Sequence, residues 1–119
     1  MLGLALFVAA SAESEFAVGA DWIANQIEPA ISAELIDPDS AHFEWPYDFT
    51  RRENGWVTCG YVNSRNRMGG YAGKAAVLVV FSPGRTPYFN IAEENSRWDG
   101  VTGMCAKWIS DGLLRQRTN

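Results

Sequence analysis

The sequence predicts one α+β domain: an N-terminal helix, a four-stranded antiparallel meander and a C-terminal helix packed on one sheet face. Three observations predict it. The chain has 119 residues, 47% hydrophobic and 20% charged, which suits a single globular domain. Apolar residues near the N-terminus recur every four positions, as on a helix face. Further along, short apolar segments alternate with turn residues, as in strands. Helices that flank a run of strands favour the α+β class, with helices on one face of the sheet.

The first helix is expected to begin at Asp21, a residue type favoured at helix N-caps. Its core face carries Ile23, Ile27, Ile31 and Leu35. Pro29 lacks a backbone donor, so the helix is either kinked there or split, with Pro29 in the first turn of a second helix. The pair at 37–38, Asp-Pro, is expected to end it.

An aromatic stripe predicts the first strand. Its members alternate with polar residues, which is typical of a half-buried strand; they are Phe43, Trp45, Tyr47 and Phe49. Pro46 cannot donate to a ladder, so this strand is expected to be bulged or at an edge. The rings are expected in the core, and a carbohydrate-stacking platform is the alternative.

The remaining elements follow from turn signals. An Asn-Gly pair at 54–55 predicts a hairpin turn. Strands are expected at 56–63, 74–81 and 88–92, and a helix at 101–110. The helix residues expected to face the core are Met104, Cys105, Trp108 and Ile109. The basic tail at 115–117 is expected to be mobile.

The first twelve residues have the pattern of a secretory signal peptide: a short apolar run that ends in Ala10-Ser11-Ala12. The alternative is an apolar helix turn or strand of the domain itself. The run is shorter than the roughly 18–20 residues that cross a bilayer. We therefore expect cleavage near Ala12, a flexible lead-in at 13–20, a domain at 21–119 without a transmembrane segment, and a secreted or periplasmic location.

Two cysteines, Cys59 and Cys105, fit this location. An even cysteine count in a small exported chain favours a disulfide, with two buried free thiols as the alternative. A bridge over about 46 residues contributes roughly 4 kcal/mol in the chain-entropy model. The sequence has no CxxC pair and no Cys/His cluster, so neither redox catalysis nor a zinc site is expected. No cofactor or metal is expected.

Two motifs resemble those of a known group of proteins. Residues 37–43 follow the pattern DPDSAxF, and residues 59–73 follow CGxVNxxNxxGGYxG. Together they resemble a group of small exported bacterial proteins of unassigned function. The resemblance covers roughly residues 28–81. It implies a helix–strand–hairpin core and a bacterial envelope setting, and it implies no activity.

The loop between the second and third expected strands is the candidate site. Its glycines permit positive φ, and its side chains combine amides, cations and an aromatic ring. The candidate residues are Asn63, Arg65, Asn66, Arg67, Tyr71 and Lys74. Such a surface suits an acidic protein, or a carbohydrate or other anionic envelope component. The alternative is a long hairpin connection whose residues serve only its turns.

Three functions follow. The favoured one is a non-enzymatic binding or inhibitor module that uses this loop. The second is a small hydrolase centred on His42, the only histidine, and the acids Asp37, Asp39 and Glu44. The third is a structural envelope protein. The sequence favours a protein that is not an enzyme, and it leaves the oligomeric state open.

Charge is divided unevenly along the chain. Residues 1–50 contain nine acids and no base, whereas residues 51–119 contain ten bases and five acids, so the two parts carry −9 and +5. The basic residues form no dense stripe and the pI is about 4.9, which disfavours nucleic acid as a partner. The two parts are expected either to pair within the domain or to make the molecule a dipole.

Overall fold

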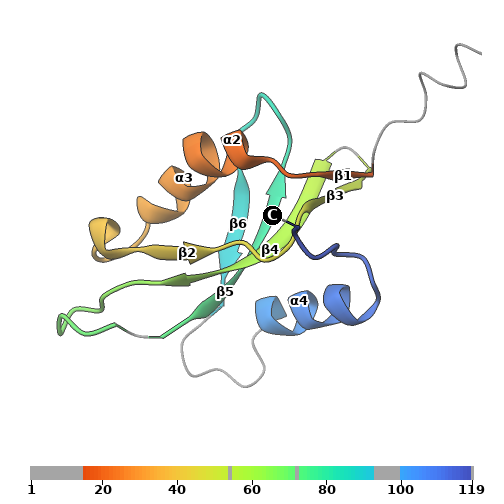
Figure 1. The fold of residues 1–119 in the computed structure, drawn as a ribbon. Coiled ribbons are helices and arrows are strands. Elements are labelled where there is room, and N and C mark those ends of the chain that lie inside the picture. Colours follow the sequence, from red (N-terminus) through yellow and green to blue (C-terminus); the bar gives the residue numbers. More distant parts are fainter. Residues whose placement is uncertain (1–14, 54, 72, 93–99, 119) are drawn as a thin grey trace, which may run out of the picture.

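The structure is a computed structural model that describes residues 15–53, 55–71, 73–92 and 100–118. It has an antiparallel sheet with a helix on each side (Figure 1). The elements, in chain order, are β1 (Phe16–Ala17), α2 (Ala20–Trp22), η1 (Ile23–Ile27), α3 (Glu28–Ser32), η2 (Pro38–Ser40), β2 (His42–Glu44), β3 (Phe49–Arg52), β4 (Gly55–Asn63), β5 (Ala75–Phe81), β6 (Tyr88–Ile91) and α4 (Gly100–Ser110).

The α+β class is confirmed, but the described part of the sheet has six strands rather than four. The strand order is β1-β3-β4-β5-β6. Strand β2 lies off this path and also pairs with β4. The expected first strand is divided because Pro46 cannot donate to the ladder, so β2 ends at Glu44 and β3 begins at Phe49. Residues 16–17, within the expected flexible lead-in, form β1 against β3. The expected signal peptide lies outside the described residues.

The N-terminal helix is one helical run made of α2, η1 and α3. In η1 the bonding is π-helical, and the N–H of Glu28 reaches the carbonyl of Ile23. Pro29 is the second residue of α3, so it lies in the first turn of a segment, as the second alternative placed it, but the backbone remains helical through Ile27 and Glu28 and does not divide into two separate helices. The helix ends at Ser32, so the expected end at 37–38 is wrong; Ile36, beyond the end, is 63% exposed.

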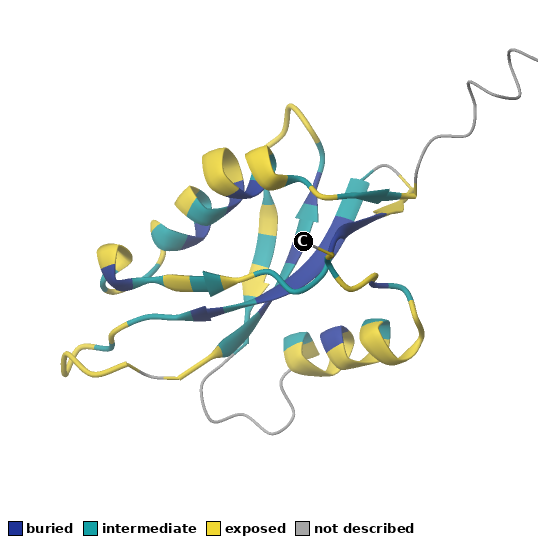
Figure 2. Ribbon diagram, viewed as in Figure 1, coloured by how far each residue is buried: buried dark blue, intermediate teal, exposed yellow. Residues whose placement is uncertain are grey.

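Two hydrophobic clusters lie on opposite faces of the sheet. Successive side chains of a strand point to opposite faces, so Val77, Val79 and Phe81 of β5 face the N-terminal helix while Leu78 faces α4. The larger cluster consists of Ile23, Ile27, Ile31, Phe49, Val77, Val79 and Phe81. Helices on a single face were therefore the wrong expectation: each face has its own helix, and the strands between them are the most buried part (Figure 2).

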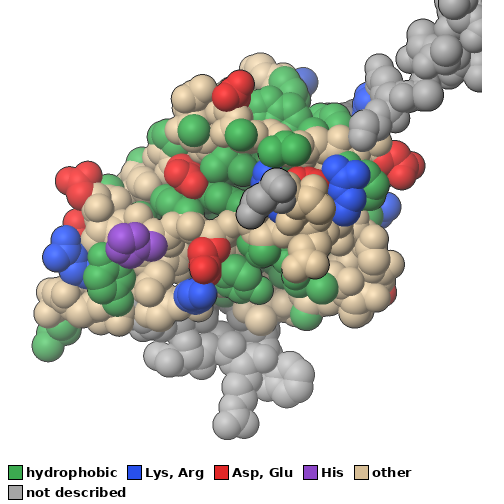
Figure 3. Space-filling view, viewed as in Figure 1, with side chains coloured by type: hydrophobic (Ala, Val, Ile, Leu, Met, Phe, Trp, Pro, Cys, Tyr) green, Lys and Arg blue, Asp and Glu red, His purple; other side chains and the backbone are tan. Residues whose placement is uncertain are grey.

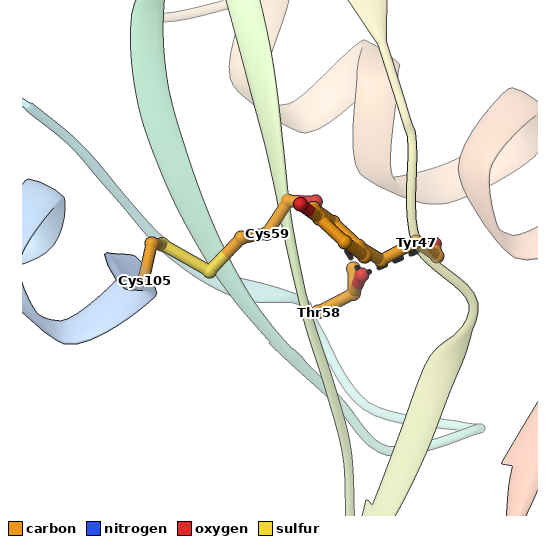
Figure 4. The surroundings of a disulfide bond; sticks show 4 residues. All are labelled: Tyr47, Thr58, Cys59 and Cys105. Carbon is orange, nitrogen blue, oxygen red and sulfur yellow. Dashed lines mark hydrogen bonds between the residues drawn. A yellow bond between two sulfur atoms is a disulfide. The ribbon is translucent and has the colours of Figure 1, made fainter. Parts of the chain in front are cut away.

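The second cluster is small and contains the disulfide. Cys59 of β4 and Cys105 of α4 are bonded, with 6.0 Å between their Cα atoms, which confirms the expected bridge (Figure 4). The third buried member is Leu114. The helix itself is confirmed, but two of its expected core residues are not, because Met104 is 43% exposed and Ile109 is 36% exposed.

The C-terminal tail is docked, which corrects the expectation that it is mobile. Tyr47 and Gln116 form an isolated antiparallel bridge. The N–H of Asp48 donates to the carbonyl of Arg115 at 2.9 Å, and the N–H of Arg117 donates to the carbonyl of Pro46 at 2.8 Å. Pro46 interrupts the sheet between β2 and β3, and the backbone of this interrupted segment pairs with the C-terminal tail instead. We call residues 113–117 the C-terminal clasp.

Within the described ranges, no helix combines the length and the apolar character needed to cross a bilayer.

Candidate functional site

The candidate loop joins β4 and β5, the two strands with the longest ladder in the sheet. The hairpin extends beyond the described sheet and projects from one end of the molecule (Figure 1). Asn66 closes its turn. The backbone N–H of Asn66 donates to the carbonyl of Gly70 at 2.8 Å, and its side-chain Oδ1 accepts the N–H of Met68 at 2.9 Å and that of Gly70 at 3.3 Å. Asn66 is therefore engaged in shaping the loop.

A second asparagine closes the base of the loop. The Oδ1 atom of Asn63 accepts the N–H of Gly73 at 3.1 Å. Gly73 has φ near +100° and Gly69 has φ near +83°, a region that other residues adopt only with strain. The amide oxygens of both candidate asparagines are thus used by the backbone rather than offered to a ligand.

Two of the three candidate cations are paired with acids. The Nε atom of Arg65 lies 3.1 Å from Oδ2 of Asp37, and the backbone N–H of Arg65 donates to Oγ of Ser40 at 2.8 Å. The Nζ atom of Lys74 lies 2.7 Å from Oε2 of Glu44. On the face shown in Figure 3, basic side chains accordingly lie beside acidic ones. These pairs fasten the hairpin to η2 and β2 and neutralise most of its charge.

The candidate tyrosine also contacts β2. Nε2 of His42 and the hydroxyl of Tyr71 form a hydrogen bond of 3.0 Å, and the two ring centroids are 5.3 Å apart. Arg65 and Tyr71 form an antiparallel bridge across the loop. The motifs at 37–43 and 59–73, distant in the sequence, are therefore in contact and form one structural unit.

The tip of the hairpin carries the side chains that remain available. Arg67 is exposed and interacts with none of the other residues that the structure describes. Met68 is 91% exposed. We call Arg67 and Met68 the hairpin tip. Met68 is not among the candidate residues predicted from the sequence, which are amides, cations and an aromatic ring. Its position two residues after Asn66 and directly before Gly69-Gly70 was the available signal for a turn.

Three of the side chains proposed for a hydrolase have partners outside that set. Asp37 and Glu44 are paired with Arg65 and Lys74, and the hydrogen-bond partner of His42 is Tyr71. Among residues 15–53, 55–71, 73–92 and 100–118, no three His, Cys, Asp or Glu side chains gather as metal ligands do.

The aromatic stripe is used mainly in packing. Phe49 is fully buried in the larger cluster, and Phe43 and Trp45 pack against that cluster with their rings 6.0 Å apart and nearly parallel. The indole N–H of Trp45 donates to Oε2 of Glu28 at 2.8 Å. Tyr47 packs against the second cluster.

An open groove of about 460 Å³ lies between β2 and the C-terminal clasp. Its charged side chains are already occupied. Glu44 pairs with Lys74, while Arg117 donates to the carbonyls of Trp45, Val18 and Tyr47 at 2.9–3.0 Å. The groove therefore offers few polar groups that could orient a ligand.

Comparison of the chain with protein-family models, curated proteins and solved structures found no match.

Proposed function

We propose that the protein is a non-enzymatic binding module of the bacterial envelope that contacts a protein partner through the hairpin tip. One observation carries the proposal: an internally bonded loop projects from the sheet and leaves Arg67 and Met68 exposed at its apex. Exposed methionine is common on surfaces that bind other proteins, and arginine is enriched in the centres of such interfaces.

The order of the loop supports this role. Binding costs free energy when a flexible loop and its side chains become fixed in the complex. Here Asn66 and Asn63 already hold the backbone, and Arg65, Tyr71 and Lys74 tie the flanks to η2 and β2. The ordering cost is thus reduced before a partner arrives.

The charge pairing favours a protein over a polyanionic ligand. Arg65 and Lys74 are neutralised by acids of the same chain, so Arg67 is the loop cation left to attract a partner. The closed turn between Asn66 and Gly70 makes the tip a compact knob rather than an extended segment. Such a knob suits an apolar pocket with an acidic group at its rim.

Export to the envelope is part of the proposal. The Cys59–Cys105 bridge supports it, because disulfides persist in oxidising compartments. Contact between the two motifs supports membership of the exported bacterial group that they resemble.

Affinity capture from bacterial envelope extract tests the function. The bait is the disulfide-bonded domain, and the test variant is Arg67→Ala with Met68→Ala. The matched control is Arg85→Ala with Met104→Ala, because these side chains are of the same types and are exposed elsewhere. We expect a captured protein to be reduced about tenfold or more by the tip variant, as for the loss of one binding hot spot, and unchanged by the control. Equal capture by both variants contradicts the proposal.

A further inference from the structure

The helix α4 has little buried surface of its own. Of its eleven residues, Cys105 alone is buried, and Val101 and Trp108 are partly buried against the second cluster. The N-terminal helix, by contrast, inserts three buried isoleucines into the larger cluster. Two of the three buried members of the second cluster are the bonded cysteines, so the disulfide is the covalent attachment of α4 to the sheet and lies at the centre of their contact.

The sequence of α4 is also a weak helix former. Isolated helices shorter than about 12–15 residues are marginal in water. The first turn contains Gly100, Val101, Thr102 and Gly103, which are glycine or β-branched residues of low helix propensity. Without its attachment to the sheet, α4 lacks the internal stability to remain helical.

The described segments that precede and follow α4 in the sequence are each attached to the sheet by contacts other than the disulfide. On one side, β6 pairs with β5. On the other, the C-terminal clasp is held by the hydrogen bond from Oγ1 of Thr50 to the carbonyl of Leu113 and by the pairing of Arg115 and Arg117 with Asp48. Detachment of α4 therefore leaves the sheet, the N-terminal helix and the clasp in place.

We propose that the Cys59–Cys105 disulfide is a redox-sensitive latch whose reduction releases α4 from the sheet while the rest of the fold persists. The reductant is a dithiol: it gives up two electrons and two protons and becomes a disulfide, while the S–S bond breaks and Cys59 and Cys105 each gain one electron and one proton and become thiols. Both sulfurs belong to nearly buried residues, 3% and 5% exposed, so the dithiol reaches the bond only during a transient local opening around it, and α4 is released once the bond is broken. Release uncovers the Cys59 and Leu78 face of the sheet.

Hydrogen exchange on the same protein, oxidised or fully reduced with a dithiol, tests the latch. Thiol labelling confirms complete reduction. We expect amides of α4 to exchange at least about tenfold faster after reduction, with β4, β5 and the N-terminal helix unchanged. The same pattern is expected in a variant with both Cys59→Ala and Cys105→Ala, which needs no reductant.

Gly103→Ala supplies a further check. An added Cβ at Gly103 meets no atom within 4 Å, so the substitution raises helix propensity without altering packing. In the reduced protein it is expected to slow the exchange of α4 relative to the reduced parent. Two results overturn the proposal: α4 remains protected after reduction, or the sheet opens together with α4.

Discussion

At the scale of single residues, some glycines and asparagines are required by the fold, although the amino-acid composition does not show this. Gly60 is the clearest case. A Cβ at this position would lie 2.5 Å from Cε3 of Trp45 and 2.6 Å from the carbonyl oxygen of Glu44. Gly60 therefore allows the indole ring to lie on the backbone of β4 at the point where Pro46 interrupts the neighbouring strand.

Gly60→Ala is expected to destabilise the protein by about 1–3 kcal/mol, the usual cost of overpacking. Urea unfolding of the oxidised protein measures it. Gly103→Ala is the matched control, because the same added methyl group meets open space there and is expected to leave stability unchanged or to raise it by up to about 1 kcal/mol. Equal effects of the two substitutions would show that the contact with Trp45 is unimportant.

At the scale of elements, the C-terminal clasp replaces the strand pairing that Pro46 prevents. Asp48 connects the clasp to the sheet, and the side chain of Asp48 is 3% exposed. Its Oδ2 atom accepts a hydrogen bond from Nε of Arg115 at 3.0 Å and lies 2.8 Å from Nη2 of the same arginine. Oδ1 lies 3.6 Å from Nη1 of Arg117, a distance too long for a hydrogen bond. Arg117 also donates to a carbonyl of the N-terminal segment, that of Val18. The clasp thus joins both ends of the described chain to the sheet.

Asp48→Ala is expected to cost about 1.5–3 kcal/mol, because it removes charge-assisted hydrogen bonds at a buried position. Asp39→Ala is the matched control: Asp39 is exposed in η2, where substitutions usually change stability by about 0.5 kcal/mol or less. Thermal unfolding at neutral pH compares the two. A loss for Asp48→Ala no larger than for Asp39→Ala would mean that the clasp contributes little.

At the scale of the whole molecule, folding brings some of the acids of residues 1–50 against bases of residues 51–119. Four ion pairs join the acidic and basic parts of the chain: Asp37–Arg65, Glu44–Lys74, Asp48–Arg115 and Asp48–Arg117. These pairs use three of the nine acids in residues 1–50 and four of the ten bases in residues 51–119, so part of the opposite charge of the two segments is paired within the domain.

These pairs differ in exposure, so salt is expected to affect them unequally. The hairpin pairs of Arg65 and Lys74 are open to solvent and are screened by ions, whereas Asp48 is buried and is screened less. We expect NaCl to speed hydrogen exchange in the hairpin at 65–71, with little change in the clasp. The total loss of stability is expected to be about 1 kcal/mol or less. Equal sensitivity of the two regions would contradict this assignment.

The sequence predicts the features that depend on local pattern. The spacing of Ile23, Ile27 and Ile31 identifies the helix, alternation identifies the strands, and Pro46 identifies the interruption in the first of them. The assignment of the two helices to opposite faces and the docking of the tail depend on contacts between residues far apart in the sequence, such as Asp48 and Arg115. No local pattern encodes them.

The candidate site is predicted only in part, because it too depends on contacts between residues that are far apart in the sequence. Turn residues identify the loop, but the pairing of its cations depends on where η2 and β2 lie, so Arg65 and Lys74 resemble free charges in the sequence. Met68 lies in the predicted loop, but its 91% exposure at the tip follows from the way the loop folds.

Site-specific photocrosslinking tests the central claim, that the hairpin tip is the contact surface, most directly. A photoreactive amino acid replaces Met68 in one variant and Met104 in the other, and each is irradiated in bacterial envelope extract. We expect a discrete crosslinked protein from position 68 that Arg67→Ala weakens, and none of the same mass from position 104. The same crosslinks from both positions, or a crosslink from position 104 alone, would contradict it.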